Sequence, residues 1–262
     1  MVYVFIINMA EKRPDRRQHM VQLMADMDMI HYEFVEPVKA TGNNNVTAGN
    51  MSLRNTLLHV IFPKAMALQV GNFIVFEDDL MTLFPKESIK NEIETILQEA
   101  CNSSWDMIYL EYCVEACFLG AQVSQRLQKA VNPMCSAAII FNSNNLQNVT
   151  NCVALHESVM SFVYSHCIRN GQINAFVTKQ PLFAQDARFQ GDMNHRGFVH
   201  HVLSHLFNIY RNTIDEDDKP TQRLPHCFDS FQTFKHLTLL FWILLLLLCI
   251  IGVYFVLRIQ KK

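Results

Sequence analysis

The sequence predicts an α/β fold, with a mainly parallel, Rossmann-like sheet and helices on both of its faces. Short, almost wholly apolar segments alternate along the chain with longer segments whose apolar residues recur at helical spacing. Apolar runs of this kind are typical of strands buried on both faces, and strands that alternate with helices form parallel sheets. The length of 262 residues suits one domain of roughly 200 residues with an appendage.

The expected elements follow in chain order. Strands are expected at the short apolar segments, which are residues 2–7, 32–35, 73–76, 107–110, 136–141 and 176–177. A helix is expected to begin near Pro14, because proline is favoured in the first helical turn and apolar residues then recur every three or four positions. Further helices are expected at residues 52–70, where Pro63 bends or breaks the helix, at 87–100 and at 154–167, and a polar loop at 40–50.

The C-terminal segment 237–257 predicts a transmembrane helix. Its 21 residues carry no charge, and a helix of that length spans roughly 30 Å, the thickness of a bilayer core. Trp242 and Tyr254 lie near its ends, where interfacial aromatic residues are expected, and the alternative is a buried core helix. The predicted organisation is therefore a catalytic domain at residues 1–210, a linker at 211–236, the transmembrane helix at 237–257 and a basic tail at 258–262.

Composition and cysteine usage limit the partners and the cellular compartment that we expect. A net charge of −2 gives no basic footprint, so we expect no nucleic-acid partner. The eight cysteines form no CxxC pair, which leaves little support for a zinc site, and we expect buried reduced thiols rather than a disulfide framework. Residues 2–7 are too short for a signal peptide. We therefore expect a tail-anchored protein with its domain in the cytosol; four N-x-Ser/Thr sequons would matter only in a lumen, the alternative placement.

The residues that carry chemistry follow the third expected strand. In the segment FIVFEDDL, Glu77, Asp78 and Asp79 come directly after four apolar residues. In open α/β sheets, ligands gather at the carboxyl ends of the strands, and three carboxylates there repel one another unless a cation joins them. Hard oxygen ligands suit Mg²⁺ or Mn²⁺, and such an ion can bridge a diphosphate. The alternative is an acidic surface loop.

An ordered set of segments resembles glycosyltransferase family 25, which includes lipooligosaccharide and procollagen galactosyltransferases. The opening VFIINMAEKRPDRRQHM resembles the family's N-terminal strand, asparagine and arginine-rich segment, and FIVFEDDL matches the strand with its acidic motif. Similar segments are found, in family order, at residues 38–42, 52–65, 105–110 and 181–185. The chain departs from the family at its Ser-His helix, since Ser52 and His59 are not adjacent, and its late Ser-Asp element is present only as Gly191-Asp192.

The resemblance implies a GT-A fold, a UDP-linked sugar donor, Mn²⁺ (or Mg²⁺) and inversion at the anomeric carbon. It places the metal on Glu77, Asp78 and Asp79, with Asp79 as the direct ligand. The same resemblance indicates that Asp78 also binds the donor, together with three residues that follow the first strand: Asn8, Arg13 and Arg17. For the two arginines, the alternative is a position on a solvated helix face.

The chemistry also requires a carboxylate that takes the proton of the acceptor hydroxyl. The candidates for this catalytic base are Asp106, Glu111 and Asp186, and for Asp106 the alternative is a capping role before a strand. The candidates for contact with the acceptor are His59 and Asp192, and the alternative for His59 is a position in the core. Asp192 or His195 is also a candidate to complete the metal shell.

The sequence therefore predicts a membrane-tethered, metal-dependent glycosyltransferase. It would move a hexose, galactose or glucose, from a nucleotide-sugar donor to a glycan or glycoprotein acceptor, while residues 237–257 contact the lipid bilayer. An alternative is a catalytically inactive, membrane-anchored binding or scaffold protein of the same fold, and a further alternative is a metal-dependent phosphohydrolase.

Overall fold

The computed structural model describes residues 2–41, 45–112, 115, 119–155, 160–186 and 188–189. The chain divides into two compact units, Met1–Cys227 and Phe228–Lys262, and the described residues all belong to the first. The expected linker, transmembrane helix and basic tail, together with Asp192 and His195, lie outside the described residues. Within those residues, no helix is both long enough and apolar enough to span a bilayer.

Seven strands of the described chain form one mixed sheet in the order β2-β1-β3-β7-β5-β8-β6. The strands β2, β1 and β3 are parallel, β7 runs antiparallel to both β3 and β5, β8 is parallel to β5, and β6 closes the sheet antiparallel to β8. Their bounds are β1 Tyr3–Ile7, β2 Tyr32–Val35, β3 Asn72–Glu77, β5 Met107–Tyr109, β6 Leu127–Lys129, β7 Ala138–Asn142 and β8 Ala175–Thr178. The predicted α/β class and mainly parallel sheet are confirmed.

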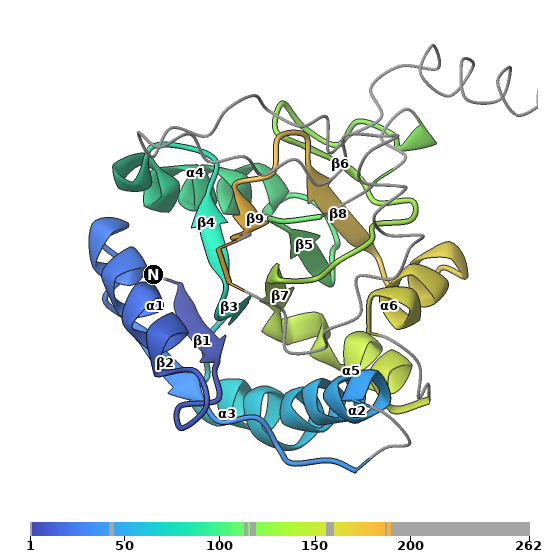
Figure 1. The fold of residues 1–262 in the computed structure, drawn as a ribbon. Helices are drawn as coiled ribbons and strands as arrows, with labels where there is room; N and C mark the ends of the chain where they lie inside the picture. Colours follow the sequence, from blue (N-terminus) through green and yellow to red (C-terminus); the bar gives the residue numbers. More distant parts are fainter. Residues whose placement is uncertain are drawn as a thin grey trace, which may run out of the picture. The chain divides into compact units, whose positions relative to one another are not determined.

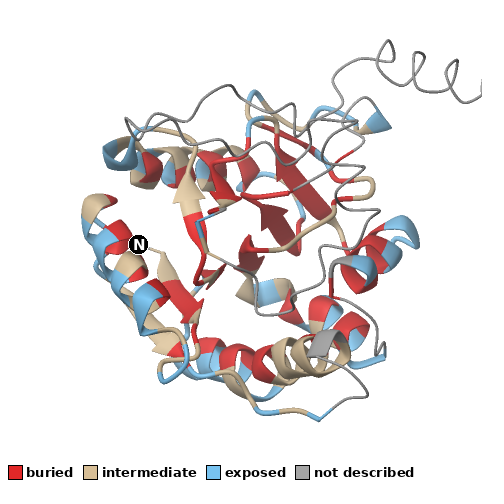
Figure 2. Cartoon of the chain, in the orientation of Figure 1, coloured by how far each residue is buried: buried red, intermediate tan, exposed pale blue. Residues whose placement is uncertain are grey.

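Helices cover both faces of this sheet (Figure 1). On one face α1 (Pro14–Asp26) and α4 (Lys86–Ala100) pack on Ile74 and Phe76 of β3. On the other face α3 (Phe62–Ala67), α5 (Leu146–Leu155) and α6 (Met160–Arg169) pack on Phe73 and Val75. The alternation of these four β3 side chains between two cores explains why residues 73–76 are all apolar, and Figure 2 shows the central strands as the most buried part of the fold.

The predicted helix at 52–70 has a different form in the structure. It starts earlier, as α2 (Asn45–Thr56), so that the expected loop at 40–50 is partly helical. It then widens into a π-helical turn, η1 (Leu57–Ile61), and continues as α3. Pro63 stands in the first turn of α3, and its missing N–H removes one i→i−4 hydrogen bond at the point where the geometry changes.

Three short strands were absent from the sequence prediction. Besides β6, they are β4 (Leu80–Thr82) and β9 (Phe183–Gln185), which pair antiparallel as a small second sheet.

The predicted helix at 154–167 is instead two helices, α5 and α6. A 3₁₀ turn, η3 (Ser143–Asn145), precedes α5, and its Asn144 N–H donates to the Asn142 side chain. Elements of three residues have no periodicity that a sequence pattern can register.

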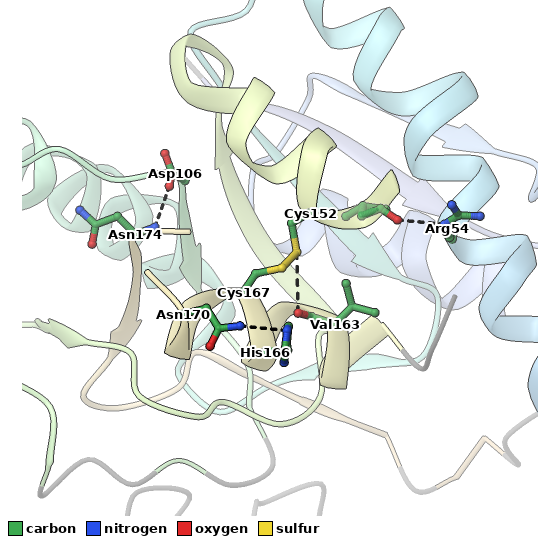
Figure 3. The surroundings of a disulfide bond; sticks show 9 residues. Arg54, Asp106, Cys152, Val163, His166, Cys167, Asn170 and Asn174 are labelled. Carbon is green, nitrogen blue, oxygen red and sulfur yellow. Dashed lines mark hydrogen bonds between the residues drawn. A yellow bond between two sulfur atoms is a disulfide. The ribbon is translucent and has the colours of Figure 1, made fainter. Parts of the chain in front are cut away.

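A disulfide joins α5 to α6, and the expectation of reduced thiols is wrong for these cysteines. The Cys152 and Cys167 Sγ atoms are 2.05 Å apart, and both residues belong to the buried core on that face (Figure 3). Cys135 is disulfide-bonded as well. The spacing of 15 residues could not reveal the pair, because the two cysteines meet only once the two helices pack together.

We predict that this disulfide contributes about 3 kcal/mol to the free energy of unfolding, as expected for a closed loop of about 15 residues. In the double variant Cys152→Ala and Cys167→Ala, the thermal midpoint should fall by roughly 6–12 °C for a domain of this size. The matched control is Cys101→Ala, which removes a free, exposed thiol and should leave the midpoint within about 1 °C. Equal midpoints for the two variants would contradict the prediction.

Candidate active site

The acidic turn lies at the carboxyl end of β3, in the parallel half of the sheet. Strand β3 ends at Glu77, which is in register with Ile7 of the neighbouring strand β1. Asp78 and Asp79 form the turn into β4, and Asn8 is the first residue after β1. Because β1 and β3 are parallel, Asn8 and the acidic turn lie at one edge of the sheet. This is the edge that the sequence predicted.

Asp78 is held by two side chains that follow β1. The Asn8 Nδ2 donates to Asp78 Oδ2 at 2.7 Å, and the Arg16 Nη1 donates to Asp78 Oδ1 at the same distance. The Asn8 amide also donates to the Arg13 carbonyl at 3.2 Å, which fixes its orientation. Asp78 is buried, so its negative charge is compensated by a cation and an amide in a region of reduced dielectric.

Arg16 is the residue that sequence reasoning missed. It is only 4% exposed, and its Nη1 lies 3.4 Å from Asp79 Oδ2 in addition to its bond with Asp78. The two predicted arginines are engaged elsewhere: Arg13 forms a salt bridge with Asp15, and the Arg17 guanidinium stacks over the Phe34 ring at 4.0 Å.

One signal in the sequence could have identified Arg16. The buried face of α1 consists of Arg16, Met20, Leu23 and Met24, so Arg16 lies one turn before Met20 on the apolar face. An arginine at a position that the periodicity assigns to the core requires a buried anionic partner. The acidic turn supplies that partner.

Two carboxyl groups at this edge, those of Glu77 and Glu111, have strongly raised pKa values. Burial, together with the charges of Asp79 and Asp78, raises the pKa of Glu77 to about 8, although Arg16 and a hydrogen bond from Gln185 oppose the shift. Burial raises the pKa of Glu111 to about 8 as well, with further contributions from Glu77 and Asp79. The edge therefore holds more carboxylates than Arg16 can neutralise.

The backbone of Ala137 connects these two glutamates. Its carbonyl accepts from the Glu77 N–H at 2.8 Å, and its N–H donates to Glu111 Oε2 at 3.0 Å. Glu111 follows β5, and its own N–H donates to the Ala138 carbonyl, so β7 fixes both residues against the same edge. Glu111 is one of the three predicted base candidates, and the charges of Glu77 and Asp79 contribute to its raised pKa.

The backbone of Asp186 also contacts the acidic turn. Its N–H donates to the Asp79 carbonyl at 2.6 Å, next to the pairing of Leu80 with Gln185. The buried carboxylate of Asp186 is bound by the Arg188 guanidinium at 2.6 and 2.9 Å. Asp186 is thus adjacent to the turn, while its side chain is committed to an ion pair.

Asp106 and His59 are not brought together with the acidic turn. Asp106 precedes β5 at the opposite end of the sheet, where its carboxylate accepts from Asn148 Nδ2 at 3.0 Å and from the Asn174 N–H at 2.7 Å (Figure 3 shows the latter). This is the capping role that the sequence left open. His59 is exposed on η1 while Leu57 and Ile61 of that turn are buried, so the core alternative for His59 is wrong.

The carboxylates of the acidic turn are candidate ligands for a divalent metal ion. No group of three or more His, Cys, Asp or Glu side chains within the described residues is arranged to hold one. A complete protein cage is not required, since Mg²⁺ is commonly bound by one or two carboxylates and completed by substrate phosphates and water. Glu77 and Asp79 provide hard oxygen donors, and burial together with the charges of Asp79 and Asp78 raises the pKa of Glu77 to about 8, a shift that a bound cation would oppose. The residues fit an ion completed by a phosphate ligand.

Comparisons with known proteins give weak structural similarity. No protein-family model and no curated protein matches the chain. A glycosyltransferase involved in the glycosylation of the major capsid of PBCV-1 superposes with a TM-score of 0.44 at 10% identity, covering 72% of this chain and 94% of that one. Drosophila β1,4-galactosyltransferase 7, as a mutant complexed with manganese, UDP-Gal and xylobiose, gives a TM-score of 0.38 at 9% identity, with coverages of 85% and 81%.

A third solved structure, apo UDP-glucose pyrophosphorylase, gives a TM-score of 0.37 at 10% identity and covers 70% of this chain and 74% of that one. All three TM-scores are below 0.5. The activity is therefore inferred from the side chains of the site, not from these similarities.

We predict that Arg16→Met lowers the free energy of unfolding by about 3 kcal/mol or more, because it leaves the buried Asp78 without its cation. Arg17→Met is the control: it removes a neighbouring arginine that stacks on Phe34, and it should cost about 1 kcal/mol or less. Adding Asp78→Asn to Arg16→Met should recover part of the loss. Denaturant unfolding measures all of these, and equal losses for the two arginine variants would refute the assignment.

We also predict that Glu111→Gln stabilises the protein at pH 8. The unfolded glutamate ionises near its ordinary pKa of 4.5, whereas the folded group keeps its proton up to about pH 8. The unfolded chain therefore binds fewer protons across this window, and stability falls as the pH rises through it. Glutamine cannot ionise, so the variant should have a thermal midpoint several degrees above wild type at pH 8 and close to it at pH 5.

The control for this comparison is Glu94→Gln on α4, where the glutamate is exposed. Its midpoint should differ little from wild type at both pH values. A Glu111→Gln variant that is destabilised at pH 8 as much as at pH 5 would show that the Glu111 carboxylate is not under electrostatic strain.

Proposed function

We propose that this chain is a nucleotide-sugar transferase with a GT-A-like domain. One observation carries the proposal: the Glu77-Asp78-Asp79 turn ends a central parallel strand, is anchored by Asn8 and Arg16, and still bears excess negative charge. Ligands of open α/β sheets bind at this end of the strands. Excess carboxylates held there by the fold suit a divalent cation and the diphosphate that such a cation bridges.

Asp79 and Glu77 are the proposed residues that would hold Mn²⁺ or Mg²⁺. When bound, the ion would neutralise charge on the diphosphate leaving group of the donor. Asp78 has a different proposed role from the one expected at first, because both of its oxygens accept hydrogen bonds from Asn8 and Arg16. It acts as a positioning residue that fixes the turn, and Arg16 keeps Asp79 directed toward the edge of the sheet.

Glu111 is the proposed catalytic base. A general base works best when its pKa lies near the operating pH, and burial beside Glu77 and Asp79 raises the pKa of Glu111 to about 8. The Ala137 N–H holds one oxygen of the carboxylate and so fixes the orientation of the group that would take the proton of the acceptor hydroxyl. Asp186 is the weaker candidate because Arg188 binds its carboxylate through two nitrogens, and Asp106 lies at the other end of the sheet.

The finer parts of the proposal rest on the resemblance to family 25. They are transfer of galactose or glucose from a UDP-linked donor, inversion at the anomeric carbon, and a glycan or glycoprotein acceptor. The apolar segment at residues 237–257 supports a further proposal, that the protein is tethered to a lipid bilayer by its C-terminal region.

The test is an assay of UDP release by the full chain in detergent, with UDP-galactose or UDP-glucose and Mn²⁺. We expect turnover that chelation abolishes, and a loss of about 100-fold or more in Asp79→Asn. The control is Asp15→Asn, which removes an exposed carboxylate paired with Arg13 and should retain activity. Rapid release of inorganic phosphate would instead favour a phosphohydrolase.

Two outcomes would contradict the enzyme proposal. With neither UDP release nor a UDP-dependent rise in the thermal midpoint, the edge does not bind nucleotide-sugars at all. With a UDP-dependent rise but no turnover on either donor, the inactive scaffold becomes the better description of this fold.

A further inference from the structure

The cysteines of the described chain are mostly oxidised. Of the four that it includes, Cys135, Cys152 and Cys167 are disulfide-bonded, and Cys101 is free. Disulfides that bridge packed elements persist in oxidising compartments and are rare in the cytosol, where thiols are kept reduced. The structure therefore favours folding in a lumen or outside the cell, in contrast to the cytosolic expectation.

The charges around the predicted membrane segment agree with that placement. Three basic residues, Arg258, Lys261 and Lys262, follow residues 237–257 within the last five positions. Basic residues close to a span are retained on the cytosolic side. If residues 237–257 cross a bilayer as the sequence predicts, a cytosolic tail would place the domain on the other side, where disulfides are stable.

An oxidising compartment of a eukaryotic cell is also where N-x-Ser/Thr sequons are used. Two of the sequon asparagines are unsuited as acceptors. Asn50 is buried in α2, where its Oδ1 accepts from the Met160 N–H. Asn148 lies within helix α5, and its Nδ2, the atom that would be glycosylated, donates to Asp106 at 3.0 Å.

Asn102 lies outside the helices, in the turn between the end of α4 at Ala100 and the start of β5, and it is exposed. Ser104, which supplies the required hydroxyl two residues later, is exposed as well. The turn is fixed from both sides. The Ser103 N–H donates to the Ala100 carbonyl, and Trp105, which follows Ser104, is buried in the core.

The turn also lies away from the active-site edge. Asn102 comes shortly before β5 and Glu111 shortly after it, so the strand separates them. A bulky glycan at the start of β5 would leave the carboxyl edge of the sheet open to a substrate.

We propose that Asn102 is an N-glycosylation site, on a domain that folds in an oxidising compartment. Asn102 Nδ2 would displace the diphosphate of an oligosaccharyl-diphosphate donor: a C–N bond forms at the anomeric carbon, the C–O bond to the diphosphate breaks, and the amide nitrogen loses a proton. No oxidation or reduction is involved. The inference does not depend on the activity proposed for the acidic edge.

The experiment is expression of the full chain in a eukaryotic secretory system, followed by treatment with a peptide N-glycosidase. We expect a mobility shift on treatment of wild type, and the loss of the Asn102-dependent step in both Asn102→Gln and Ser104→Ala. The matched control is Asn148→Gln, which should keep the full shift. Because Asn102 and Ser104 are exposed, neither variant should lower the thermal midpoint of the purified protein by more than about 2 °C.

Thiol labelling of the same cells tests the compartment independently. When the cells are lysed in denaturant with an alkylating agent, we expect Cys152 and Cys167 to resist alkylation until a reductant is added. An unglycosylated wild type, or a shift of unchanged size in both Asn102→Gln and Ser104→Ala, would overturn the glycosylation site. Alkylation of Cys152 and Cys167 in the denatured protein without reductant would overturn the oxidising compartment.

Discussion

The ion pair between Arg16 and Asp78 is the interaction on which the candidate site depends. It joins α1 to the turn after β3, and through Asn8 it also fixes the chain that leaves β1. Burying a guanidinium and a carboxylate is costly, and the cost is recovered only when both are well hydrogen-bonded. The two bonds of 2.7 Å satisfy both oxygens of Asp78, so the turn is held in one geometry.

The same ion pair explains the electrostatics of the edge. One guanidinium faces Asp78 and Asp79, while Glu77 and Glu111 lie close enough for their charges to repel those of the turn. Burial, together with these charges, raises the pKa of both glutamates to about 8. A cation at this edge would compete with the protons that the two glutamates hold, and this is the physical basis of the proposed binding of a metal–diphosphate group.

The two ends of the sheet serve different purposes. At the carboxyl end of β3, the buried side chains of Asn8, Arg16 and Asp78 are hydrogen-bonded to one another. At the opposite end Asp106 binds Asn148 and the Asn174 backbone, which ties α5 and the loop before β8 to the start of β5. Carboxylates of similar burial therefore have a structural role at one end of the sheet and a proposed chemical role at the other.

The strands and the acidic turn could be predicted because their signals are local: four apolar residues followed by Glu77, Asp78 and Asp79 define a buried strand and its end. Arg16 could not be chosen from composition, since Arg13, Arg16 and Arg17 look alike until the helical phase of α1 is known. The Cys152–Cys167 disulfide, the antiparallel direction of β7 and the β4–β9 pair depend on contacts between distant segments. Such contacts leave no pattern in a single sequence.

The central claim, that the acidic edge binds a metal–diphosphate group, is tested most directly by calorimetric titration of the full chain with UDP and Mn²⁺ at pH 6 and pH 8. Because a cation must displace the proton that Glu77 holds below its pKa of about 8, we predict one site per chain with affinity that rises by at least tenfold between the two pH values. Absence of binding, or equal affinity at pH 6 and pH 8, would contradict the claim.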